Sequence, residues 1–128
     1  MSTTACPCGS QRLLNECCGQ YLYTETDAPT AEALMRSRYT AFALKNIPYI
    51  LSTVPSEYPQ NEQEINDWAF TCEFVKLQVI RKQQGKSSHR KGVVEYIASF
   101  IENGKAQELH EVAHFRQVNK QWFYIPYE

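Results

Sequence analysis

Two different spacings of apolar residues divide this chain into a helical part and a strand part. Between residues 31 and 44 the apolar positions recur with the 3.6-residue period of an amphipathic helix. Thr30 is expected to cap this helix and Asn46 to end it. Pro48 favours a short second helix over 48–51, and Asn61 caps a third over 61–68. The first half of the chain therefore predicts three helices.

From residue 73 onward the apolar positions follow a period of two, which indicates strands over 73–81, 93–101, 107–118 and 121–127. Asn103-Gly104 is a strong signal for a two-residue hairpin, and this turn places Tyr96 opposite Glu111. A second tight turn at 119–120 places Phe115 opposite Tyr124. Helices followed by an antiparallel sheet with one apolar face predict an α+β fold whose helices cover that face.

Length and charge limit the class of protein. A chain of 128 residues with 43% hydrophobic residues can bury a core of its own as one unit. Its formal net charge of -1 gives no overall field that would attract nucleic acid. We expect no targeting segment, and the apolar runs are too short to cross a bilayer. We expect a soluble, cytoplasmic protein without a membrane or nucleic-acid partner.

The cysteines are concentrated near the amino end. Four of the five lie within thirteen residues, at Cys6, Cys8, Cys17 and Cys18, and Cys72 stands alone. In a reducing compartment such a cluster indicates a metal, and four thiolates match the tetrahedral preference of structural zinc. A redox or disulfide role is the alternative, although the adjacent Cys17 and Cys18 cannot bridge without backbone strain. We predict zinc bound by these four cysteines.

The cysteine spacing also carries a resemblance. Cys6-Pro-Cys8-Gly-Ser followed by Cys17-Cys18-Gly resembles the SEC-C zinc motif, named for the carboxy-terminal tail of the translocase ATPase SecA. Segments 34–42, 94–100, 109–115 and 121–124 resemble the YchJ family of uncharacterised small bacterial proteins. The resemblance implies a zinc motif over 1–22 and, over 23–128, a domain like nuclear transport factor 2 (NTF2), whose curved sheet encloses a conical pocket.

Two charged residues interrupt faces that are otherwise apolar. Arg38 lies within the apolar stripe of the first helix, and Glu111 lies on the apolar face of the sheet. One interpretation is a buried ion pair without chemistry. The other is a pocket that binds a polar or anionic small ligand. The pocket residues would then be Arg38, Tyr39, Tyr96, Glu111, Phe115, Trp122 and Tyr124.

The other chemistry-bearing residues favour structural roles. We expect His110 and His114 to be exposed on one face of a strand, and Cys72 to be buried and inert. Segment 81–91 contains five lysines and arginines and no acid. It lacks the interleaved aromatic residues that stack bases, which favours a solvated hairpin loop over an RNA site.

Together these patterns predict a zinc-stabilised binding or adaptor protein with a pocket domain. The zinc motif would contact a protein partner, and the pocket would hold a small ligand. The alternative is a small-molecule enzyme in which Glu111 acts as acid and base and Arg38 is its electrostatic partner. No nucleophile with an orienting partner is evident in the sequence, so no catalytic residue is assigned.

Overall fold

The computed structural model describes residues 4–126, in which helices precede strands as the sequence predicts. Two short elements occupy the cysteine-rich segment, and three longer helices follow. They are η1 (Leu14–Glu16), α1 (Gly19–Leu22), α2 (Ala31–Leu44), α3 (Ile47–Ser52) and α4 (Glu62–Thr71). The predicted caps are confirmed, because Thr30 accepts the Ala33 amide at 3.0 Å and Asn61 accepts the Glu64 amide at 3.0 Å.

The predicted end of the first long helix is confirmed, since α2 stops at Leu44 and the Asn46 amide donates to the Ala41 carbonyl at 2.7 Å. Lys45, with a left-handed φ of 63°, makes the turn between Leu44 and Asn46. Asn46 also caps the start of α3, where its side chain accepts the Tyr49 amide. Because Lys45 supplies the turn, α3 folds back beside α2 without a longer loop.

The sheet has four antiparallel strands in sequence order. They are β1 (Cys72–Gln84), β2 (Lys91–Glu102), β3 (Lys105–Val118) and β4 (Gln121–Ile125). The predicted register is confirmed: Tyr96 pairs with Glu111, and Phe115 pairs with Tyr124. Asn103 and Gly104 both have positive φ, 52° and 78°, as a type I′ turn requires. Tyr127, which the sequence assigns to the last strand, lies outside the described residues.

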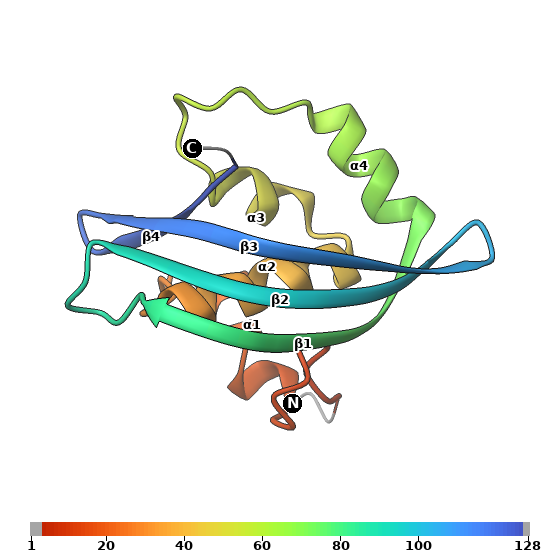
Figure 1. Ribbon diagram of the computed structural model, residues 1–128, viewed down its shortest axis with the longest axis horizontal. Coiled ribbons are helices and arrows are strands. Elements are labelled where there is room, and N and C mark those ends of the chain that lie inside the picture. Colours follow the sequence, from red (N-terminus) through yellow and green to blue (C-terminus); the bar gives the residue numbers. More distant parts are fainter. Residues whose placement is uncertain (1–3, 127–128) are drawn as a thin grey trace.

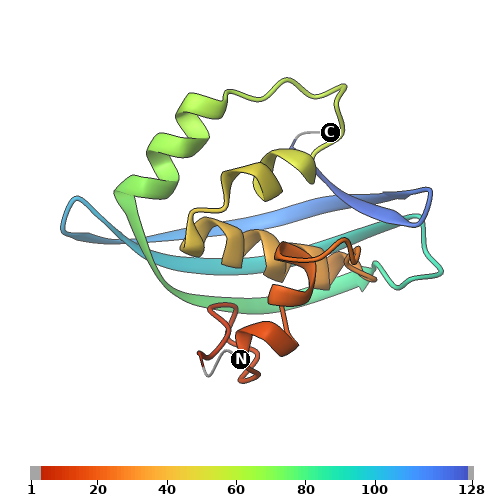
Figure 2. The ribbon, with the colours of Figure 1, turned by 180° about the vertical axis from the view of Figure 1, so that it is seen from behind.

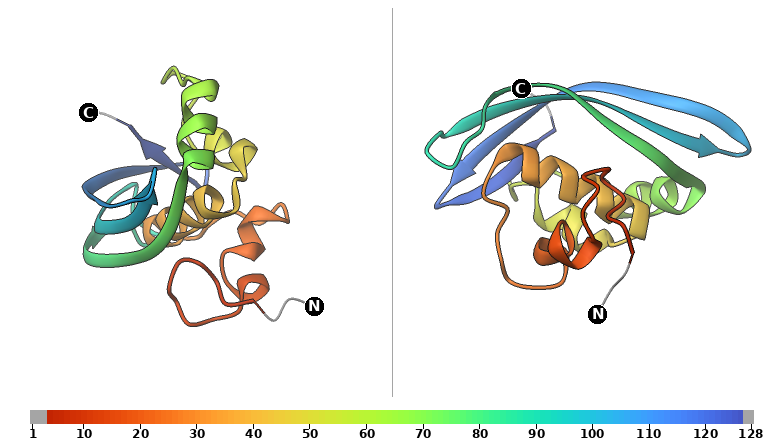
Figure 3. Two further views of the ribbon diagram at one scale, coloured as in Figure 1. Left: turned by 90° about the vertical axis from the view of Figure 1, so that its right-hand side faces the viewer. Right: turned by 90° about the horizontal axis from the view of Figure 1, so that it is seen from below.

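The sheet curves over one layer of helices (Figures 1 and 3). α2 lies against its concave face, α3 packs beside α2, and α4 lies at one end, directly before β1. β1 has irregularities between Phe74 and Lys76 and between Val79 and Arg81, and bulges of this kind bend a strand. The α+β prediction is confirmed. Among the described residues, none of the helices has the length and apolar character needed to span a bilayer.

Helix α2 is buried on two sides rather than one. Its apolar side chains Leu34, Met35 and Tyr39 are at most 5% exposed. Ser37 and Thr40, on the side opposite the predicted stripe, are also fully buried. They are covered by α3 and by the N-terminal segment, which lies beside α2 in Figure 2. The hydroxyl of Ser37 is satisfied by that of Tyr49 at 2.7 Å.

The start of α2 is attached to the β1–β2 hairpin. The Ala31 amide donates to the Gly85 carbonyl at 2.9 Å. A Cβ added at Gly92 would lie 2.5 Å from the Gly85 Cα and 3.0 Å from the Ala31 Cβ. Glycines are therefore required where the hairpin and the helix meet, and this contact holds α2 across the sheet.

Candidate functional site

The four clustered cysteines are brought together around one point. Their sulfur atoms all lie within 4.8 Å of one another. The Sγ atoms of Cys8 and Cys17 are 3.6 Å apart, and those of Cys17 and Cys18 are 4.0 Å apart. Tetrahedral zinc with Zn–S bonds of about 2.3 Å separates its sulfurs by about 3.8 Å. All four thiols are free of disulfides, so the donor set and its spacing fit one zinc ion.

A small folded loop positions these cysteines. Ala5 and Leu13 form an antiparallel bridge, and the Cys6 amide donates to the Arg12 carbonyl at 2.9 Å. Gly9, with a φ of 81°, turns the chain between Cys6 and Arg12. Cys17 and Cys18 follow between η1 and α1, two elements that the sequence pattern does not predict. The Ser10 hydroxyl lies 3.2 Å from the Cys17 sulfur.

The thiols strongly affect one another. Hydrogen bonds with the thiols of Cys18 and Cys8 lower the pKa of Cys6 to about 3. The corresponding bonds with Cys6 and Cys8 raise the pKa of Cys18. The first thiolate to form is thus stabilised by hydrogen bonds from the neighbouring thiols. Its negative charge then opposes the ionisation of a second thiol in the cluster. A bound cation would remove this opposition, because it favours deprotonation of every thiol that coordinates it.

The cysteine cluster packs directly on α2. The Arg36 guanidinium donates from Nη1 to the Cys8 carbonyl at 2.7 Å, and the Thr40 hydroxyl lies 3.7 Å from the Cys6 sulfur. Cys6, Cys8 and Cys18 belong to the same buried core as the sheet residues that face α2. Sequence reasoning does not identify Arg36 and Thr40 as neighbours of the cysteines. Arg36 and Thr40 are four residues apart and therefore lie on one polar face of the helix, and this spacing is the only local sign that the face could meet another segment.

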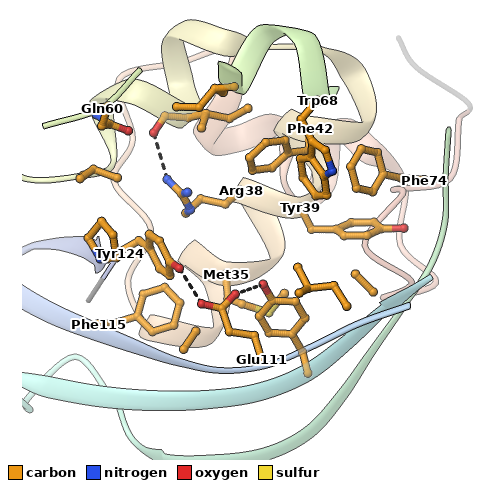
Figure 4. Close-up of a pocket in the computed structure, with 18 residues that line it drawn as sticks. Met35, Arg38, Tyr39, Phe42, Gln60, Trp68, Phe74, Glu111, Phe115 and Tyr124 are labelled. Carbon is orange, nitrogen blue, oxygen red and sulfur yellow. Dashed lines mark hydrogen bonds between the residues drawn. The ribbon is translucent and has the colours of Figure 1, made fainter. Parts of the chain in front are cut away.

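On the sheet side of α2 lies a cavity of about 310 Å³, partly open to solvent (Figure 4). Six of the seven predicted pocket residues line it: Arg38, Tyr39, Tyr96, Glu111, Phe115 and Tyr124. Trp122 does not. Its ring is 2% exposed and lines a separate hollow, and its Nε1 donates to the Pro29 carbonyl at 3.2 Å. Trp122 therefore anchors the segment before α2 instead of walling the cavity.

Arg38 and Glu111 face the same cavity without forming an ion pair. In the part of the chain that the structure describes, Arg38 donates from Nη1 to the Ile50 carbonyl at 2.9 Å and to the Thr53 hydroxyl at 2.6 Å. Its guanidinium carbon lies 4.4 Å from the centre of the Tyr124 ring, a cation–π contact. Burial lowers the pKa of Arg38. Of the two interpretations of this pair, the buried ion pair does not form, because α3 and its C-cap residue supply other acceptors for Arg38.

Two tyrosines hold the Glu111 carboxylate. Tyr96 donates to Oε1 and Tyr124 donates to Oε2, each at 2.5 Å. Burial first, and the nearby Glu111 second, raise the pKa of Tyr96. Burial and the bond to Glu111 also raise the pKa of Tyr124. Both phenols therefore stay protonated and act as the donors that hold the Glu111 carboxylate in place.

The other end of the cavity is aromatic. The centre of the Trp68 ring lies 5.2 Å from the centre of the Phe42 ring and 5.2 Å from that of the Phe74 ring, in edge-to-face contacts. Figure 4 shows these three rings on one side of the cavity, with Arg38 and Tyr124 on the other. The sequence pattern does not assign the three rings to the pocket, because they come from α2, α4 and β1. No local pattern indicates that these elements meet.

The remaining predictions concern residues away from both sites. His110 is exposed, as predicted, and its Nε2 lies 2.7 Å from Glu95, which also accepts a bond from Arg81 at 3.1 Å. His114 is exposed as well. Cys72 is 3% exposed, and burial raises the pKa of its thiol, which agrees with an inert role. Segment 81–91 forms the ends of β1 and β2 and the turn between them, confirming a hairpin.

Comparisons with known proteins agree with this architecture. A family model described as the YchJ middle NTF2-like domain matches residues 30–126. The chain is 40% identical over 123 residues to a UPF0225 protein of Chromobacterium violaceum, covering 94% of this chain and 90% of that protein. It is 37% identical over 128 residues to a UPF0225 protein of Bordetella parapertussis, covering 97% and 92% of the two chains.

Two solved structures of SEC-C motif-containing proteins are also similar. The solution structure from Rhodopseudomonas palustris has a TM-score of 0.86 and 34% identity, over 96% of each chain. The crystal structure from Psychrobacter arcticus has a TM-score of 0.82 and 28% identity, over 97% of this chain and 81% of that one. The NTF2-like fold and the SEC-C resemblance predicted from sequence are confirmed. The chain thus belongs to the YchJ family, with an NTF2-like domain packed against an amino-terminal cysteine cluster.

Proposed function

We propose that this chain is a zinc-stabilised protein that binds a small molecule in the cavity between α2 and the sheet. The observation that carries the proposal is the cavity itself, which has charged groups at one end and aromatic rings in edge-to-face contact at the other. Ligand sites typically combine an apolar wall with a few fixed polar groups, and about 310 Å³ lies at the lower end of their usual size. The cavity therefore suits a ligand of one or two rings.

The metal has a structural role in this proposal. Cys6, Cys8, Cys17 and Cys18 would hold zinc through four thiolates, with no position left for a substrate. When bound, zinc would supply folding free energy to the amino-terminal segment. Because Arg36 connects that segment to α2, the metal would also keep in place the helix that carries Arg38 and Tyr39. The protein partner predicted for this motif stays a prediction.

Binding is better supported than catalysis. Within the described residues, the cavity lining contains no serine, cysteine, histidine or lysine. Glu111 is the one carboxylate in that lining, and both of its oxygens already accept hydrogen bonds from tyrosines. The enzyme alternative, with Glu111 as acid and base beside Arg38, would need Glu111 to give up these bonds.

Narrowing the cavity mouth tests the proposal. Leu109 lines the cavity and is 38% exposed, while Val112 is 44% exposed on the opposite face of the same strand. In an NMR titration with indole, we expect the Trp68 and Met35 side-chain signals of the wild type to shift. Leu109→Trp should weaken this binding at least about tenfold, and Val112→Trp should leave it unchanged. Absence of indole binding, or equal losses in both variants, would refute a ligand site in this cavity.

A further inference from the structure

The two ends of the cavity differ in what they offer a ligand. The aromatic end, formed by Phe42, Trp68 and Phe74, presents apolar surface. The polar end contains one cation, Arg38, and one anion, Glu111. An apolar body at the aromatic end would leave its substituents to meet these two groups. What Arg38 and Glu111 can still bind therefore decides the chemical class of the ligand.

Arg38 retains unused donors that face the cavity. Both of its protein hydrogen bonds come from Nη1, to the Ile50 carbonyl and the Thr53 hydroxyl. Among the described residues, no buried side-chain nitrogen or oxygen lacks a partner. Within residues 4–126, Nε and Nη2 of Arg38 have no protein acceptor, so they are not sealed in the core and are open to the cavity. These two atoms form the edge of a guanidinium that binds a carboxylate through paired hydrogen bonds.

The rest of the arginine is held in position for such a contact. Nη1 is fixed by α3, and the Tyr124 ring lies 4.4 Å from the guanidinium carbon. The free edge therefore has little freedom to rotate away. A ligand that meets a pre-positioned arginine loses less entropy on binding than one that must order a flexible side chain.

Glu111 limits the charge that the ligand can carry. Its carboxylate is fixed by Tyr96 and Tyr124 at 2.5 Å each, so it cannot turn away from an anion in the same cavity. A doubly charged phosphate would face one arginine and be repelled by Glu111. A single carboxylate on Arg38 avoids most of this repulsion. A hydroxyl or amide of the ligand could still donate to Glu111.

We infer that the cavity selects a ligand with an apolar, ring-sized body and one carboxylate, and that Nε and Nη2 of Arg38 bind that carboxylate. This inference rests on the proposed function, because it names the class of molecule that the cavity takes. The body of the ligand lies among Phe42, Trp68 and Phe74, and its carboxylate lies over Tyr124 against Arg38.

Three probes separate this inference from the proposed function. Indole is apolar and neutral, indole-3-acetate adds a carboxylate, and indole-3-acetamide replaces that carboxylate with a neutral group of the same shape. In NMR titrations of the wild type, indole-3-acetate should bind at least about tenfold more tightly than the amide. The Arg38 Nε–Hε signal should move with the acetate and stay in place with the amide. Equal affinities for acetate and amide would overturn the carboxylate inference while leaving the ligand site intact.

Variants test the role of Arg38 directly. Arg38→Gln should reduce the affinity for indole-3-acetate to that for the amide, and Arg81→Gln, on the outer face of the sheet, should preserve the wild-type ratio. A variant Arg38→Gln that folds and keeps the preference would overturn the assignment to Arg38. If this variant fails to fold, the role of Arg38 is decided on the wild type, by the ratio of its affinities for the acetate and the amide and by the movement of the Arg38 Nε–Hε signal. Failure of all three probes to bind would refute the proposed function itself.

Discussion

Tyr124 and Tyr96 each donate one hydrogen bond to Glu111, and replacing either with phenylalanine removes the bond but keeps the ring. A hydrogen bond to a charged group contributes about 1.5–3 kcal/mol to stability. Glu111 is half-buried beside a cavity that is partly open to water, so a water molecule can replace part of each bond. We therefore expect Tyr124→Phe or Tyr96→Phe to lower the free energy of unfolding by about 1–2 kcal/mol. Arg38 keeps its ring contact in Tyr124→Phe.

Urea unfolding at neutral pH, followed by circular dichroism, measures these changes. Tyr23→Phe is the control, because Tyr23 is 63% exposed, and we expect its effect to stay below about 0.5 kcal/mol. The double variant should lose more than the sum of the single losses, since each tyrosine supports the carboxylate when the other is absent. Losses below about 0.5 kcal/mol in both single variants would show that the tyrosines do not hold Glu111. The inference that a fixed Glu111 carboxylate limits the charge of the ligand would then lose its support.

Three further predictions concern the cysteine cluster and the buried tyrosines. Chelation of the metal should lower the melting temperature of the wild type. Cys17→Ser should have the melting temperature of the chelated wild type, and Cys72→Ser should keep the response to chelator. Identical responses to chelator in the two variants would argue against zinc at the cluster. Arg36→Gln removes the donor to the Cys8 carbonyl and should cost about 1–3 kcal/mol in urea unfolding, whereas the exposed Arg81→Gln should cost less than about 0.5 kcal/mol. Burial raises the pKa of Tyr39 and of Tyr49 to about 12, from an ordinary value of 10.0. Unfolded chains release these protons first, so stability should be full below pH 10 and decline as the pH rises to about 12. The decline should be shallower in Tyr39→Phe, and a melting temperature that is constant over this range would contradict the assignment.

Local sequence signals are sufficient to predict the sheet and much of the polar end of the cavity. Asn103-Gly104 sets the register of β2 and β3, and that register places Glu111 opposite Tyr96. The second turn places Tyr124 beside them on the same face. Periodicity also places Arg38 on the covered face of α2. It cannot distinguish an ion pair from two separate cavity groups, because the acceptors that engage Arg38 come from α3.

The missed features depend on contacts between distant parts of the chain. Phe42, Trp68 and Phe74 meet because α4 docks at the end of the sheet and β1 bends, and neither event has a local signature. The same holds for Arg36 and Thr40, whose polar side chains suggest a solvated helix face. They are covered because the cysteine cluster lies on that face. Trp122 lies on the face of β4 that the sequence predicts. Its contact with the Pro29 carbonyl has no local signal, because the two residues are far apart in the chain.

The claim that the cysteine cluster stabilises a ligand cavity is tested most directly by one titration series. Indole is added to the purified protein as isolated, after chelation, and after zinc is restored, and binding is followed through the Trp68 and Met35 signals. We predict binding in the first and third samples, with about one zinc ion per chain, and at least about tenfold weaker binding in the second. Equal binding in all three samples, or protein isolated with less than about half a zinc ion per chain, would contradict the account.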